Sequence, residues 1–146
     1  MKGNDIMKKI VDLLRENARL TNEQLAVILE TTEEEVAKEI KQLEENGTII
    51  GYSAIINEEQ LDKNAVTAFI EVKVSQQVEC GYDDIAKAIA QYDEVDTVQL
   101  MSGSFDLSVT LRGNNLREVA LFVNERLATL DGVLSTTTHF ILQRYK

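Results

Sequence analysis

The chain holds one cysteine, Cys80, and one histidine, His139, so few of its side chains are suited to covalent or metal chemistry. One thiol cannot form an internal disulfide, and it excludes a metal site built from several cysteines. His139 has no second histidine or cysteine near it, so a packed or surface histidine is the expected interpretation. No nucleophile–base pair, metal-ligand cluster or phosphate-binding loop is visible, which argues against an enzyme and against a bound cofactor.

The first candidate site is the short polar segment from Ser102 to Asp106, which reads Ser102-Gly103-Ser104-Phe105-Asp106. A tight hairpin requires positive φ at some position, and glycine with small polar residues satisfies that need, so one explanation is purely structural. The same residues could also bind a ligand. Backbone N–H groups around Gly103 can meet a carboxylate, while Asp106 can pair with an ammonium group or brace the loop.

The second candidate is a charged helical stretch from Glu33 to Glu45. At about 100° per residue, Ile40 and Leu43 lie beside Val36 on the inward side. The outward side then carries Glu34, Lys38, Lys41 and Glu45, which form two i,i+4 pairs, 34–38 and 41–45. The stretch holds six acids and two bases, so one interpretation is a solvated helix face.

The composition excludes several classes of protein. The 146 residues include 25 acidic and 15 basic side chains, for a formal net charge of −10. This balance argues against a non-specific nucleic-acid coat, which needs many Lys and Arg. No apolar run approaches the roughly 18 residues that cross a bilayer, and residues 1–9 lack a following apolar signal region. We therefore expect a cytoplasmic globular protein with no membrane partner.

The amino-terminal half shows only helical signals. Apolar spacing predicts a first helix over 5–17, and capping boxes beginning at Thr21 and Thr32 predict two more. Gly47 should end the third helix in a left-handed conformation. Three short helices of this kind make a helix-turn-helix unit. The β-branched run 48–56 predicts a strand, which would be the wing or the start of a connector, and the polar run 57–64 predicts a domain boundary.

The carboxy-terminal half alternates strand and helix signals in the order βαββαβ. Strands are expected at 66–74, 94–101, 105–112 and 133–145, and helices at 82–92 and from Asn114 or Asn115 to Gly132. This order is that of the ferredoxin-like arrangement, in which both helices cover one face of the sheet. Four apolar side chains exceed what one face needs, so we expect a partner on the open face: Val72, Val74, Phe140 and Leu142.

Several motifs follow one another in the order of a known family. They are Leu25-Ala26, Val36 to Leu43-Glu44, Asn46-Gly47, Ile49-Ile50-Gly51-Tyr52, Ser102 to Asp106, and Gly132-Val133 with Thr136-Thr137-Thr138. In this order the chain resembles, over nearly its whole length, the Lrp/AsnC (feast/famine) transcription regulators. The hairpin is similar to that family's TG-x-[YF]-D turn, with Ser102 where threonine is usual.

The resemblance implies an α+β protein with an amino-terminal winged helix-turn-helix and a ferredoxin-like domain. It implies a homodimer, often assembled further into tetramers or octamers, that binds double-stranded DNA and a small amino acid held between subunits. The implied effector residues are Ser102, Gly103, Ser104, Phe105, Asp106 and Thr137, with hydroxyls of Thr136 and Thr138 alongside. The implied DNA-binding residues are Thr21, Thr32, Glu34, Lys38 and Lys41.

The reading helix departs from the family pattern. Arginine is usual at the position of Lys38, and Ala37 and Glu39 stand where arginine or serine is common. Loss of the guanidinium removes the bidentate fork that recognises guanine. Thr32 can still bond a phosphate, and Glu34 can accept from a cytosine amino group. Outside the helix, Lys8, Lys9, Arg15 and Arg19 could contact the DNA backbone.

Two hypotheses therefore remain open. The first is a sequence-specific regulator whose DNA binding responds to an amino acid. The second is an oligomeric amino-acid sensor or interaction module whose helix-turn-helix binds DNA weakly or not at all. In both, residues 1–52 form the winged helix-turn-helix, 53–65 a strand linker, and 66–146 the effector-binding and oligomerisation domain. Neither hypothesis requires a metal, a cofactor or a catalytic residue.

Overall fold

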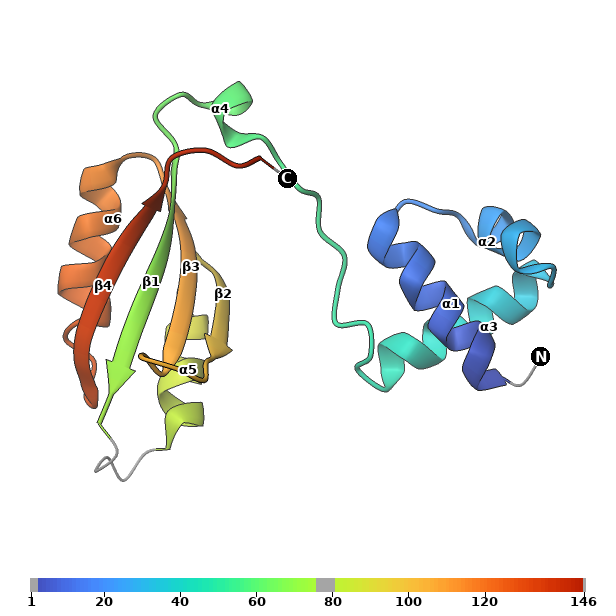
Figure 1. Cartoon of the computed structure of the whole chain (residues 1–146), viewed down its shortest axis with the longest axis horizontal. Helices are drawn as coiled ribbons and strands as arrows, with labels where there is room; N and C mark the ends of the chain where they lie inside the picture. Colours follow the sequence, from blue (N-terminus) through green and yellow to red (C-terminus); the bar gives the residue numbers. More distant parts are fainter. Residues whose placement is uncertain (1–2, 76–80, 146) are drawn as a thin grey trace. The chain divides into compact units, whose positions relative to one another are not determined.

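The computed structural model describes residues 3–75 and 81–145, so Cys80 lies outside the described residues. The chain divides into two compact units, Met1–Ile56 and Asn57–Lys146. We call them unit 1 and unit 2 and describe each by itself. Figure 1 shows unit 1 as helices alone and unit 2 as a sheet with helices.

Unit 1 consists of three helices, α1 (Gly3–Glu16), α2 (Asn22–Leu29) and α3 (Glu33–Glu45). Each helix is amphipathic, and the inward rows pack together because their apolar residues recur at helical spacing. The buried residues of these rows are Ile10, Leu25, Ala26, Leu29, Val36 and Leu43. The three-helix arrangement predicted from the sequence is therefore confirmed.

Side-chain caps determine where α2 and α3 begin. Thr21 accepts a hydrogen bond from the N–H of Gln24 at 3.2 Å, and its own N–H donates to Gln24 Oε1 at 3.0 Å, so the first capping box is complete. Thr32 accepts from the N–H of Glu35 at 3.2 Å. The second box is only half formed, because the Glu35 carboxylate accepts from the Thr31 hydroxyl instead of reaching the Thr32 N–H.

A left-handed residue follows each of α2 and α3. Glu30 (φ 53°) ends α2, and Gly47 (φ 75°) follows α3 as predicted. Beyond Gly47 the N–H of Ile49 donates to the carbonyl of Leu43 at 2.9 Å, which brings Ile49 against the core. The break between α2 and α3 is therefore tight, and α3 is held at both ends.

The predicted wing strand over 48–56 is wrong for the single chain, because residues 50–57 have no regular secondary structure. A strand requires a neighbour to share its ladder of hydrogen bonds, and this stretch has no such neighbour in the described part of unit 1. Only Ile49 packs inward. Ile50 and Ile55 are 97% and 75% exposed, although their types favour a strand.

Unit 2 begins with a one-turn helix, α4 (Glu58–Leu61), in the polar run 57–64. Four antiparallel strands follow in the spatial order β2-β3-β1-β4, and they are β1 (Val66–Val74), β2 (Val95–Leu100), β3 (Leu107–Gly113) and β4 (Val133–Ile141). The predicted βαββαβ order is confirmed, with the last strand ending at Ile141 rather than 145.

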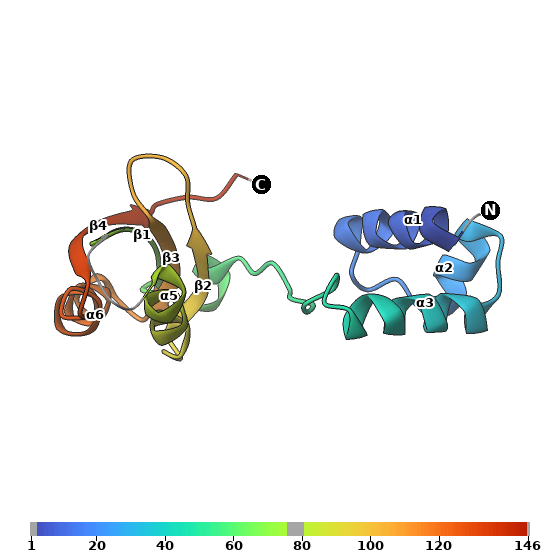
Figure 2. The ribbon, with the colours of Figure 1, turned by 90° about the horizontal axis from the view of Figure 1, so that it is seen from below.

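Two helical segments cover one face of this sheet (Figure 2). They are α5 (Tyr82–Ala90) and α6 (Leu116–Phe122), and α6 continues into a π-helical turn, η1 (Val123–Leu127). Their apolar residues meet the alternate residues of the central strands. The core consists of Ala68, Ile70, Val72, Val74, Ile85, Ile89, Leu107, Val109, Leu111, Val119, Phe122, Val123 and Leu127.

Four apolar residues were expected to meet a partner on the open face, and this expectation is wrong for three of them. Val72 and Val74 are 0% and 5% exposed, because they share the helix-covered face with Ala68 and Ile70. Phe140 also packs against this core. The open face instead carries mainly polar residues at the alternate positions of β1, β3 and β4, among them Thr67, Glu71, Lys73, Thr110, Arg112, Thr137 and His139.

Gly113, the last residue of β3, lies close to α6. A Cβ atom at this position would lie 2.7 Å from Cγ2 of Val119, which is buried. We expect Gly113→Ala to lower the free energy of unfolding by about 1–3 kcal/mol through overpacking, measured by urea denaturation. Gly51→Ala is the control, since no atom lies within 4 Å of its added Cβ, and a change under about 0.5 kcal/mol is expected. Equal losses in both variants would contradict this account.

Candidate DNA-reading helix and effector hairpin

All five residues predicted to contact DNA lie on the surface of unit 1. Thr32, Glu34, Lys38 and Lys41 follow one another along α3 from its amino-terminal end, while Thr21 stands at the start of α2. The inward residues Val36 and Leu43 fix the rotation of α3, so the charged residues face solvent. The structure therefore presents this face, although its contact with DNA stays a prediction.

One of the two predicted ion pairs on α3 is present. Lys41 Nζ lies 3.8 Å from Glu45 Oε1, with both side chains well exposed. Lys38 forms no ion pair with Glu34 among the described residues. An exposed pair of this kind contributes little to stability, so both ammonium groups remain available to a phosphate.

The two capping threonines can serve a second purpose. In each cap the hydroxyl oxygen accepts a backbone N–H, at 3.2 Å for both Thr21 and Thr32. A hydroxyl group can accept and donate at the same time. The O–H of Thr32 can therefore donate to a phosphate without breaking the cap that begins α3.

The hairpin between β2 and β3 is anchored to β1 by Asp106. The Asp106 Oδ2 atom accepts the N–H of Val74 at 2.8 Å, and the Asp106 N–H donates to the carbonyl of Val72 at 3.0 Å. The N–H of Met101 closes the hairpin on the Asp106 carbonyl at 2.8 Å. Of the two roles considered for Asp106, bracing the loop is thus present in the structure. A carboxylate can accept further hydrogen bonds, so the second role remains open.

The tip of the hairpin is exposed and holds Gly103 at φ 146°, the positive value that the sequence predicted. The backbone N–H groups of Ser102, Gly103 and Ser104 donate to no other described residue. Successive N–H groups of this kind can bind an anion. The loop therefore offers donors to a carboxylate beside a fixed Asp106.

Phe105 extends the hairpin onto the open face of the sheet. Its ring meets Phe69 of β1 edge to face, with ring centroids 6.1 Å apart. The His139 ring is tilted against Phe69, and its centroid is also 6.1 Å from that of Phe69. His139 Nε2 is 3.4 Å from Glu71 Oε1, and Glu71 lies opposite Thr137 in the register of β1 and β4. Sequence reasoning missed Phe69, Glu71 and His139 as neighbours of the hairpin, because only the strand register brings them there.

The three consecutive threonines of β4 do not act together. Thr137 is exposed on the open face with His139. Thr136 and Thr138 lie opposite Val72 and Ile70, on the face covered by helices. Of the three hydroxyls, only that of Thr137 belongs to the surface that carries Phe105.

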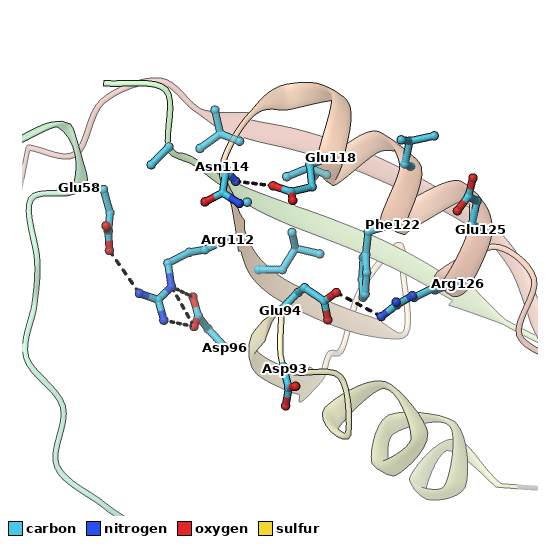
Figure 3. Close-up of a pocket in the computed structure, with 16 residues that line it drawn as sticks. Glu58, Asp93, Glu94, Asp96, Arg112, Asn114, Glu118, Phe122, Glu125 and Arg126 are labelled. Carbon is cyan, nitrogen blue, oxygen red and sulfur yellow. Dashed lines mark hydrogen bonds and ion pairs between the residues drawn. The ribbon is translucent and has the colours of Figure 1, made fainter. Parts of the chain in front are cut away.

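A separate pocket of about 460 Å³ lies at the other end of β3 (Figure 3). Arg112 occupies one wall, where its Nε and Nη2 atoms donate to Asp96 at 2.7–3.0 Å and its Nη1 atom donates to Glu58 at 3.3 Å. The hydrogen bonds and charge of Asp96, with a smaller effect of Glu58, raise the pKa of Arg112 above its usual value. Arg112 is thus a fixed cation.

Arg126 forms the other wall of this pocket. Its Nη1 atom donates to Glu94 at 3.1 Å, and its guanidinium lies 5.5 Å and 5.6 Å from the ring centroids of Tyr92 and Phe122. Sequence reasoning did not find this cluster, and none of the predicted site residues lines it. No local pattern could have found it, because Glu94 and Arg126 are 32 residues apart.

The described residues hold neither a candidate metal site nor a membrane-spanning helix. No group of three or more His, Cys, Asp or Glu side chains in 3–75 and 81–145 could hold a metal ion. Within the same ranges, every helix is too short or too polar to cross a bilayer.

Comparisons with known proteins match both units. A winged helix-turn-helix DNA-binding model matches residues 4–50, and the Lrp/AsnC ligand-binding domain matches residues 67–146. The HTH-type transcriptional regulator YugG of Bacillus subtilis is 44% identical over 100% of this chain and 89% of its own length. The leucine-responsive regulatory protein of Escherichia coli is 24% identical, over 97% of this chain and 85% of its own.

Solved structures show the same fold. A transcriptional regulator from Neisseria meningitidis, in complex with L-Met, has a TM-score of 0.75 and 26% identity, covering 100% of this chain and 92% of that chain. The relatives that match by sequence are transcriptional regulators. In this chain a DNA-binding domain is followed by the Lrp/AsnC ligand-binding domain. The chain is therefore a transcriptional regulator rather than an enzyme, and it belongs to the Lrp/AsnC family.

Proposed function

We propose that this regulator binds specific double-stranded DNA sites through α3 and that a small amino acid bound to unit 2 changes this binding. In this proposal residues 1–52 read DNA, 53–65 connect, and 66–146 bind the effector and form a homodimer that can assemble further. The observation that best supports this proposal is the hairpin, where three exposed N–H donors lie beside the carboxylate of Asp106, which itself accepts from Val74 N–H.

An α-amino acid suits that arrangement because it carries both charges that the hairpin can meet. Its carboxylate can accept from the N–H groups of Ser102, Gly103 and Ser104, and its ammonium group can donate to Asp106. The related regulator from Neisseria meningitidis holds L-Met, which supports this ligand class. Phe105, Phe69 and Thr137 offer one apolar and one hydroxyl surface nearby.

The open face of the sheet supports a placement of the effector between subunits. The hairpin and Phe105 lie on the face of the sheet that no helix covers, so a second copy seated there would close over a bound ligand. A ligand enclosed by two subunits can alter DNA binding only if it favours one assembly over another. This supplies the coupling that the proposed regulation needs.

The charge of α3 supports the second hypothesis, a sensor that binds DNA weakly. Its first turn holds Glu33, Glu34 and Glu35. These carboxylates stabilise the helix by interacting with its dipole, but they repel phosphate. The two hypotheses differ in one observable, the affinity for the regulator's own promoter at low salt. Binding with a defined footprint supports the regulator, and its absence at low ionic strength supports the sensor.

Salt dependence tests the contribution of Lys38. Each phosphate contact adds about 0.9 to the slope of log affinity against log salt, so Lys38→Gln should reduce the slope by about 1.8 in a dimer. Fluorescence anisotropy with promoter DNA across a salt series measures this. Lys87→Gln, in the last turn of α5, is the matched control and should leave the slope unchanged. An unchanged slope for Lys38→Gln would remove Lys38 from the interface.

Thr32 permits a test that separates capping from DNA contact. Aspartate and serine are both good amino-terminal caps, so Thr32→Asp and Thr32→Ser should each keep the free energy of unfolding within about 1 kcal/mol. Only aspartate places a negative charge against a phosphate. We expect at least a tenfold loss of DNA affinity for Thr32→Asp relative to Thr32→Ser. If the two variants bind equally well, Thr32 is a cap and nothing more.

Asp106 is tested by thermal shift with a panel of L-amino acids. Asp106→Ala removes both the ammonium partner and the acceptor for Val74 N–H, so it should abolish the ligand-induced shift. Asp106→Asn keeps an acceptor oxygen for that N–H but loses the charge, and we expect about tenfold weaker ligand binding with the fold retained. A shift that persists unchanged in Asp106→Ala would exclude this residue from the site.

A further inference from the structure

The segment that connects the two units makes one side-chain contact at each of its ends. Between α3 and β1, only Ile49 packs into a core, and residues 50–57 have no regular structure. Yet Tyr52 contacts α3, and Glu58 contacts β3. Each contact lies within a single unit, the first in unit 1 and the second in unit 2.

The first contact fixes the start of the segment to the reading helix. The hydroxyl of Tyr52 donates to Glu44 Oε1 at 2.9 Å, and Glu44 lies in the last turn of α3. Partial burial, with the hydrogen bond and charge of Glu44, raises the pKa of Tyr52 above its usual value, so the phenol remains a donor. The chain is therefore held against α3 as far as Tyr52.

The second contact fixes the end of the segment to the sheet. Glu58 begins α4 and accepts from Arg112 at 3.3 Å, as the close-up in Figure 3 shows. Arg112 is itself held by two-point bonding to Asp96 of β2, and its backbone pairs with Thr67 of β1. Leu61, the last residue of α4, is exposed, so Glu58 provides the side-chain contact that holds this single turn against the sheet.

These contacts shorten the connection that is free to move. With both in place, five residues, 53–57, lie between them. With both lost, a single helical turn is too short to persist alone, and the stretch 50–65 becomes free. A flexible chain spans about 12 Å for five residues and about 22 Å for sixteen. Since effective concentration falls roughly as the −3/2 power of length, the longer chain dilutes the reading unit about sixfold.

We propose that Tyr52 and Glu58 are positioning residues for DNA recognition, which keep the reading units of a dimer close enough to engage two half-sites together. This inference rests on the proposed DNA binding by α3 and on a dimer joined through unit 2. It adds two residues that contact no DNA base and no effector. Their effect is confined to binding events in which two units act at once.

The test compares the full-length Tyr52→Phe/Glu58→Met double variant with the wild type on DNA carrying two half-sites and on DNA carrying one. Phenylalanine lacks the hydroxyl donor and methionine lacks the carboxylate acceptor, so each substitution removes one contact and keeps a side chain of similar size. The control is Tyr145→Phe/Asp83→Asn, which removes a hydroxyl from an 89% exposed tyrosine and one carboxylate from the first turn of α5. Hydrogen exchange of peptides covering 48–64 is followed in parallel, without DNA.

We expect the double variant to lose up to about sixfold in affinity for the two-half-site DNA and less than twofold for the single half-site. Exchange in α4, where the N–H of Asp62 donates to the Glu58 carbonyl at 2.9 Å, should become several-fold faster. Equal losses on both DNAs, or unchanged exchange, would overturn the proposal. If the wild type binds no DNA, the proposed function fails, while the exchange measurement still decides whether the two contacts hold the segment.

Discussion

Strand β1 is hydrogen-bonded on both sides, to β3 and to β4, and this double pairing determines the face on which every candidate residue of unit 2 lies. Its alternate residues, such as Ile70 and Val72, are buried beneath the helices, and those between them, such as Phe69 and Glu71, face outward. The register of β1 with β3 ends at the Val72–Leu107 pair, and beyond it the Val74 N–H donates to the carboxylate of Asp106. The strand that builds the core therefore also fixes the candidate effector loop.

Features encoded locally were predictable from the sequence, and those that depend on distant partners were not. The caps at Thr21 and Thr32 and the stop at Gly47 each depend on neighbours a few residues away. The predicted strand over 48–56 was wrong, because β-branched residues favour a strand only where another strand can pair. The face of Val72 depends on where the helices pack, and the pairing of Arg112 with Glu58 joins residues 54 apart. Neither leaves a local signal.

Helix α3, which we propose reads DNA, combines two requirements that conflict. Acidic residues at its start favour the helix through its dipole, and Glu33, Glu34 and Glu35 fill that turn. The same charges oppose a phosphate backbone, and only Lys38 and Lys41 on this helix counter them. Stability of the helix is thus gained at some cost to electrostatic attraction. Recognition by such a helix must depend more on shape and on specific hydrogen bonds than on net charge, which favours discrimination over strength.

The π-helical turn η1 has a consequence for how the length of this chain can vary. A π turn bonds each residue to the fifth along instead of the fourth, so Val123–Leu127 accommodates one residue more than a regular turn. Val123 and Leu127, the two end residues of this turn, both lie in the core. Removing a single residue here would let the helix relax to regular geometry while its two ends keep their places. Homologous chains that differ by one residue can therefore absorb the difference at this turn without displacing β4.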